Sequence, residues 1–101
     1  MFLYNITVKV NTNIEDAWKL WQKEIFIPAL MNTDLFYKHE FFQLLEQDES
    51  DGKTFVIQFF ARERWQYDQF IQDHVTNFNN QSAEKWGDQF IDFRTLLSSV
   101  K

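Results

Sequence analysis

The fold is decided by the stretch Thr54-Phe55-Val56-Ile57-Gln58-Phe59-Phe60-Ala61, which reads as a β-strand. Alternate side chains of a strand point to opposite faces, so one face carries Phe55, Ile57, Phe59 and Ala61. The other face carries Val56, Gln58 and Phe60. Because only Gln58 in this set is polar, we expect the strand to be covered on both faces. Helices of so short a chain can cover one face, and a second copy of the protein is predicted to cover the other.

The composition fits one folded domain over residues 1–101. Hydrophobic residues make up 45% of the chain and aromatic residues 19%. This is enough for one core, which excludes intrinsic disorder, and it leaves apolar surface for a pocket or a subunit interface. The chain has no cysteine, so disulfides, thiol nucleophiles and thiolate metal sites are excluded.

The charge balance excludes other classes of partner. The net charge is −5 and no cluster of Lys or Arg occurs, so neither nucleic acid nor an acidic membrane surface is an expected partner. The first residues have no basic region followed by an apolar run, and no segment approaches the roughly 20 apolar residues of a membrane span. We therefore expect a soluble, cytoplasmic protein.

The first half of the chain reads as strand, helix, strand. Residues 2–10 alternate as a strand, and Thr12-Asn13-Ile14-Glu15 matches a helix capping box. The helix that follows carries an apolar stripe, with a kink or break expected at Pro28. A second strand is expected over residues 35–46, with a bulge at Phe41-Phe42. The predicted stripe consists of Ile14, Ala17, Trp18, Trp21, Ile25 and Pro28.

The second half repeats this order after an acidic turn that ends in Asp51-Gly52. The strand over residues 54–61 is followed by a helix from residues 64–67 to Trp86, bent over the polar residues 77–82, with Gly87 after its end. A last strand is expected over residues 88–100. The predicted stripe of this helix consists of Tyr67, Phe70, Ile71, His74 and Phe78.

The two halves correspond at a constant offset of 53 residues, which predicts a duplicated βαβ unit. The predicted fold is α+β and ferredoxin-like, βαββαβ, with two helices on one face of a four-stranded antiparallel sheet and the first and third strands central. Leu3, Asn5 and Thr7 would then lie beside Val56, Gln58 and Phe60 on the open face. From the edge strands we expect this face to include some of Tyr37, His39 and Phe41, together with Phe90, Asp92, Arg94 and Leu96. A two-fold homodimer would cover it.

Three motifs make the chain similar to a known bacterial family, domain of unknown function 4286. They are Tyr4-Asn5-Ile6-Thr7-Val8, Ile27-Pro28, and Trp86-Gly87-Asp88-Gln89-Phe90 with Phe93-Arg94-Thr95. The resemblance covers essentially the whole chain and implies a dimeric ferredoxin-like α+β barrel, without an activity. The family typically has His before its Ile-Pro, where this chain has Phe26, so chemistry that needs that His is not carried over. The family's helix-two His matches His74.

A polar cluster of Asn5, Gln58, Asp92 and Arg94 is the candidate ligand site or interface network. Asn5 and Gln58 are equivalent at the offset of 53, so they are expected side by side on the open face, with Arg94 and Asp92 joining them. Such a cluster either binds a small polar or anionic molecule or fixes the register of two sheets in a dimer. We favour the second reading.

Candidate catalytic residues are His74, Trp65 and Asn5. His74 is either a structural His on an apolar stripe or a ligand, acid or base. The three together are similar to the Asn, Trp and His of dimeric α+β barrel haem-degrading monooxygenases, although helix periodicity separates Trp65 from His74. His39 and His74 lack metal-ligand spacing, so no metal site or cofactor is predicted. The leading hypothesis is a non-catalytic homodimer whose polar sheet face is covered by its symmetry mate, with a small molecule as a second candidate partner. The alternative is a haem-using or cofactor-free monooxygenase or isomerase with His74 in a helix–sheet pocket.

Overall fold

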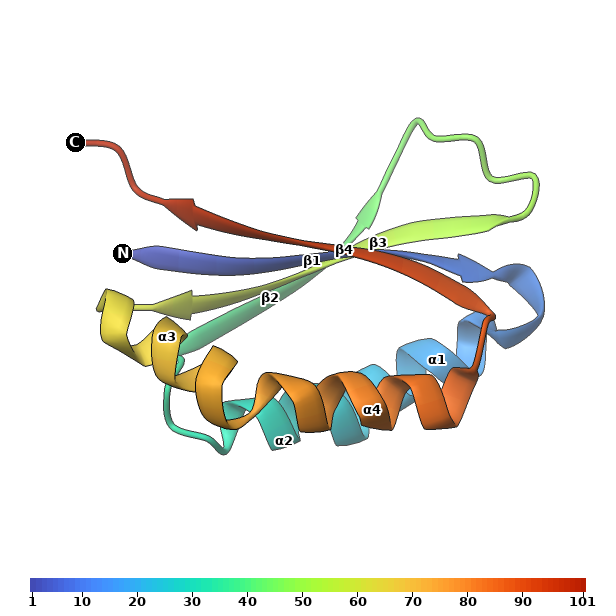
Figure 1. Cartoon of the computed structure of the whole chain (residues 1–101). Helices are drawn as coiled ribbons and strands as arrows, with labels where there is room; N and C mark the ends of the chain where they lie inside the picture. The colour runs from blue at the N-terminus through green and yellow to red at the C-terminus, as the bar shows by residue number, and fades with distance from the viewer.

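Four antiparallel strands form one sheet in the order β2-β3-β1-β4 in the computed structural model, which describes residues 1–101 (Figure 1). The two long strands are central, so the predicted ferredoxin-like topology is confirmed. The strands are β1 (Phe2–Asn11), β2 (Lys38–Leu44), β3 (Gly52–Ala61) and β4 (Phe90–Ser98).

All the helices lie on one face of this sheet (Figure 1). The first connection contains the 3-10 turn η1 (Thr12–Ile14), α1 (Glu15–Trp21), the π-helical turn η2 (Gln22–Phe26) and α2 (Ile27–Met31). The second contains α3 (Arg64–Asp73) and α4 (Val75–Trp86). The helices and the inner sheet face enclose a core of 18 buried apolar residues. None of the helices has the length and apolar character needed to cross a membrane.

The first helix differs from its predicted stripe because of the π-helical turn. Pro28 has no N–H to donate to the carbonyl four residues earlier, and the helix widens just before it, with Ile27 N–H bonded to Gln22 O. The extra residue in this turn brings Phe26 inward in place of Ile25, which is exposed, and Gln22, four residues after Trp18, is buried on the same side. Ala17 and Pro28 are exposed as well. The predicted stripe was therefore wrong at Ala17, Ile25 and Pro28.

The capping box and the helix break both lie at other residues than predicted. The predicted capping box at Thr12 is absent, and no side chain caps η1 or α1. A capping box is formed instead by Glu63 and Gln66 at the start of α3. The second helix breaks at His74, where the backbone leaves helical geometry, and not over residues 77–82. β2 pairs with β3 without the predicted bulge and begins at Lys38, because Leu35 and Phe36 pack into the core.

The inner and outer faces of the central strands are as predicted, but the faces of β4 are reversed, and two of the candidate residues of β2 also lie on the inner face. Phe90, Asp92, Arg94 and Leu96 of β4 pair with Val10, Val8, Ile6 and Tyr4 of β1. Directly paired residues share a face, so these four side chains lie on the helix side. His39 and Phe41 of β2 lie on that side too, opposite Phe59 and Ile57. Both edge strands carry apolar residues at odd and even positions, so alternation could not determine which face was inward.

Candidate functional site

A polar row crosses the middle of the outer sheet face. Glu40 of β2, Gln58 of β3, Asn5 of β1 and Thr95 of β4 are successive cross-strand partners. Gln58 Nε2 donates to Asn5 Oδ1 at 3.2 Å, and Asn5 Nδ2 donates to Thr7 Oγ1 at 3.2 Å. The structure thus places Asn5 and Gln58 side by side, as expected. Their unused hydrogen-bonding groups point away from the helices, where a partner molecule can reach them.

Apolar rows flank this polar row on both sides. One contains Phe60 and Leu3 at its centre, and the other contains Val56. Large apolar side chains on the edge strands of the same face are more exposed than these central ones, which are half-buried. Their exposed fractions are 68% for Phe93, 63% for Ile91, 49% for Leu97, 49% for Phe42 and 39% for Leu44. We call the surface formed by the polar row and these neighbours the outer face. Contiguous exposed apolar surface of this kind is typical of an interaction site.

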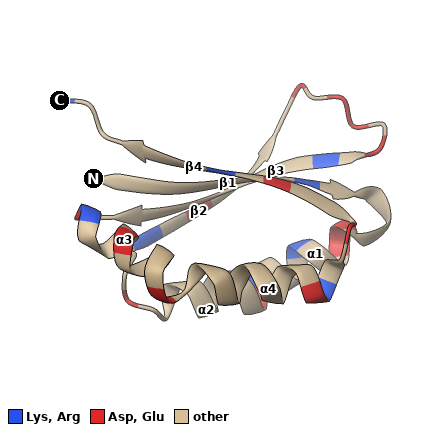
Figure 2. Ribbon diagram, in the orientation of Figure 1, with Lys and Arg blue, Asp and Glu red and all other residues tan.

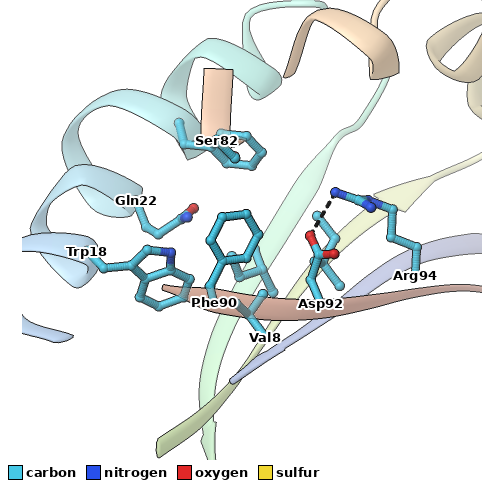
Figure 3. Close-up of a pocket in the computed structure, with 10 residues that line it drawn as sticks. Val8, Trp18, Gln22, Ser82, Phe90, Asp92 and Arg94 are labelled. Carbon is cyan, nitrogen blue, oxygen red and sulfur yellow. Dashed lines mark hydrogen bonds and ion pairs between the residues drawn. The ribbon is translucent and has the colours of Figure 1, made fainter. Parts of the chain in front are cut away.

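Asp92 and Arg94 do not belong to the outer face. They form an ion pair on the helix side of β4, with Arg94 Nη2 donating to Asp92 Oδ2 at 2.8 Å (Figure 3). The expected cluster of four is therefore two separate pairs on opposite faces. Two charges can lie on the inner side of this edge strand because they neutralise each other and stay partly hydrated, with 32% and 20% of the Arg94 and Asp92 side chains exposed.

The ion pair lines a small cavity between helix and sheet. Its volume is about 20 Å³, and Gln22, Ser82, Asp92 and Arg94 supply its polar walls. Figure 3 shows the Gln22 amide directed into the space between Trp18 and Phe90. Gln22 is only 4% exposed, and its Oε1 has no hydrogen-bond partner. Gln22 was not among the residues predicted for a site. The only signal is the spacing of four that joins Trp18, Gln22, Phe26 and Leu30.

Aromatic side chains fill the rest of the interior. Tyr4 packs between Phe36, Phe59, Tyr67 and Phe70, with ring centroids 5.4–6.3 Å apart. Burial raises the pKa of Tyr4 to about 12, and the nearby positive charge of Arg94 opposes part of this rise. Tyr4 is therefore a neutral core residue at physiological pH.

The candidate catalytic residues do not converge. Asn5 is on the outer face, whereas Trp65 is 58% exposed at the start of α3. His74 lies at the break between α3 and α4, stacked on Phe70 at a centroid distance of 6.0 Å, and it does not line the cavity. His39 is exposed on an edge strand, and no three His, Asp or Glu side chains meet in the fold.

The acidic turn forms the tip of the hairpin between β2 and β3, where Figure 2 shows acidic residues close together. The Ser50 backbone N–H donates to Asp48 Oδ1 at 3.0 Å and lowers the pKa of that carboxyl. Lys9 binds Asp51 at 2.6 Å and lowers the Asp51 pKa. Two of the carboxylates in this turn, those of Asp48 and Asp51, thus have partners within the protein.

The topology and the open sheet face define a ferredoxin-like α+β protein. The chain matches the model of the family described as Domain of unknown function (DUF4286) over residues 1–100, and it belongs to this family. No curated protein matches it.

Solved structures with low sequence identity share the fold. A dimeric ferredoxin-like protein from an uncultured marine organism has a TM-score of 0.74 at 11% identity, covering 100% of this chain and 96% of that chain. An ethyl tert-butyl ether d (ethd) family protein from Bacillus halodurans has a TM-score of 0.68 at 9% identity, covering 99% and 100%. A mutant of SnoaB, a cofactor-independent oxygenase from Streptomyces nogalater, has a TM-score of 0.64 at 8% identity, covering 99% and 94%.

Proposed function

We propose that this protein is a non-catalytic homodimeric module in which the outer faces of two copies pack against each other. One observation carries the proposal: the outer face exposes large apolar side chains on both edge strands, among them Phe93 and Phe42. Packing two such faces would remove this surface from water. Burial of apolar area contributes a favourable free energy of about 25 cal/mol for each Å². The similar fold of a protein described as dimeric supports the formation of a dimer.

The polar row gives this interface its register. Two sheets related by a two-fold axis present the same surface to each other, so a central polar row meets its own copy. The amides of Asn5 and Gln58 would then pair across the interface, whereas a shifted register would bury them against Phe60 or Val56. Because an unpaired buried amide is costly, the polar row favours a single register over the alternatives.

The filled interior supports a binding or scaffolding role over catalysis. A cavity of about 20 Å³ has room for about one water molecule, whereas typical small-molecule sites measure about 300–1,000 Å³. Tyr4, Trp18 and their aromatic neighbours occupy the space between helices and sheet where a substrate would lie. Any ligand of this interior is therefore small.

A second candidate function is an oxygenase or isomerase of the α+β barrel type, either haem-using or cofactor-free. The observation that favours it is the shared fold of SnoaB, described as a cofactor-independent oxygenase. A haemin titration separates the haem-using form from the leading proposal. A Soret shift that is lost in His74→Ala supports haem binding, whereas the non-catalytic module predicts no specific shift in either protein.

Charge placed on the outer face tests the leading proposal. Phe93→Glu would bury a carboxylate in each half of the symmetric interface, and we expect it to raise the dimer dissociation constant at least about 100-fold in sedimentation experiments. Trp65→Glu is the matched control, because Trp65 is an aromatic side chain of similar exposure on α3. An unchanged dimer dissociation constant in Phe93→Glu would contradict the proposal that the outer faces form the interface.

A further inference from the structure

Gln22 occupies an inward position that the helix could have given to an apolar side chain. The π-helical turn begins at Gln22 and ends at Phe26, and both line the cavity. The same turn leaves Ile25 51% exposed while Gln22 is 4% exposed. Exposing an isoleucine and burying an amide acceptor without a partner both reduce stability. Single π-helical turns occur frequently at functional sites.

The Gln22 Oε1 acceptor has no donor within the protein, and the cavity has space for a molecule that can supply one. Its volume of about 20 Å³ exceeds the roughly 10–15 Å³ that one water requires. Polar groups from three elements surround it: Gln22 from η2, Ser82 from α4, and the Asp92–Arg94 pair from β4 (Figure 3). A water site needs two to four polar partners, and this cavity offers that number.

The charges around the cavity select a neutral occupant. Arg94 is already neutralised by Asp92 at 2.8 Å, so an anion would meet the Asp92 carboxylate and a cation would meet the guanidinium. The remaining walls are apolar and include Trp18, Phe26 and Phe90. We propose that this cavity is a binding site for one hydroxyl group of a neutral molecule, whose O–H donates a hydrogen bond to Gln22 Oε1. The hydroxyl belongs either to water or to a small alcohol.

Nuclear magnetic resonance of the full chain tests the site with water and methanol as probes. In the wild type we expect NOE and ROE cross-peaks from bound water to the Gln22 side-chain amide and to the Trp18 indole N–H, with the signs of a long-lived contact. Gln22→Met keeps the length of the side chain but has no strong acceptor, so the water contact at the Trp18 indole N–H should be lost. Gln72→Met, the same change at an exposed position of α3, should retain it.

The outcomes separate the two sources of the hydroxyl. Water contacts without any saturable methanol-dependent shift at Gln22 and Trp18 support the site with water as its occupant. Water contacts together with such a shift, lost in Gln22→Met, support a site that accepts alcohols. A wild type without water contacts at Gln22 and without a methanol shift has a dry cavity, which overturns the proposal. The wild-type result decides even if Gln22→Met fails to fold, and it does not depend on dimer formation.

Discussion

The side chains of Asn5 and Gln58 are joined by a hydrogen bond of 3.2 Å between the two central strands, although 53 residues separate them in the chain. This separation equals the offset between the two βαβ halves, so equivalent positions of the repeat meet at the middle of the sheet. Both amides lie on the face without helices. In the proposed dimer this pair lies near the centre of the interface.

Truncating one member of this pair should weaken the dimer. Asn5→Ala leaves the Gln58 amide without its partner in a surface that the dimer buries, and we expect a loss of about 1–3 kcal/mol in the free energy of dimer unfolding. The double variant Asn5→Leu with Gln58→Leu should recover most of this loss, because no unpaired amide remains. Denaturant titrations followed by circular dichroism measure both values.

Asn13 provides the matched control for that experiment. Its Nδ2 donates to Gln89 Oε1 at 3.1 Å, but the contact is exposed. Asn13→Ala should therefore change the free energy of unfolding by less than about 0.5 kcal/mol. Equal effects of Asn5→Ala and Asn13→Ala would mean that the outer face stays in water.

Gly52 should tolerate no side chain. It begins β3 with φ +146°, and a Cβ there would lie 2.0 Å from the Val10 carbonyl oxygen. Since both the backbone conformation and the contact with β1 oppose it, Gly52→Ala should cost at least about 4 kcal/mol in thermal or denaturant unfolding.

Gly87 separates the cost of the backbone conformation from the cost of the close contact. It has φ +62° but nothing within 4 Å of an added Cβ. Gly87→Ala should therefore show the conformational strain alone, about 1–3 kcal/mol. If Gly52→Ala costs no more than Gly87→Ala, the close approach of β3 to β1 is not as described.

The burial of Tyr4 predicts a loss of stability at high pH. Its pKa is raised from 10.0 to about 12 in the folded state. Below pH 10 the Tyr4 hydroxyl is protonated in both states, and its contribution is fully present. As the pH rises from 10 to 12 the unfolded chain ionises first, so stability should fall by about 2–3 kcal/mol.

Denaturant unfolding over this pH range measures the effect as a difference between proteins. Tyr4→Phe should lose this part of the pH dependence, whereas Tyr37→Phe, at an exposed tyrosine, should keep it. The lysine residues titrate in all three proteins, so their contributions cancel in the comparison. A wild type and a Tyr4→Phe variant with the same pH dependence would contradict the burial of the Tyr4 hydroxyl.

The central strands could be predicted from the sequence because the alternation of apolar and polar side chains allows only one face of each strand to be the inner face. Tyr4, Ile6 and Val8 on one face of β1 leave Asn5 and Thr7 on the other, and the repeat at 53 residues fixes β3 opposite them. Composition and periodicity were therefore enough for the fold, the layers and the position of the Asn5–Gln58 pair.

The helix–sheet cavity could not be predicted, for two physical reasons. A π-helical turn changes the helical period within one turn, so a stripe drawn at a constant angle placed Ile25 inside, where Phe26 lies, and Gln22 was passed over because it is polar. In β4, both alternating sets contain apolar residues, and the pairing with β1 decides that Asp92 and Arg94 face the helices. The position of Asp92 and Arg94 thus depends on a strand pairing between residues distant in the sequence.

The solution mass of the wild-type protein tests the central claim most directly, since the outer face is proposed to be covered by a second copy. One chain has a mass of 12.3 kDa. Sedimentation equilibrium or light scattering over a dilution series should give twice this mass, with dissociation only at low concentration. A folded protein that keeps the mass of one chain at every concentration, with Val56 and Phe60 in contact with water, would contradict the account.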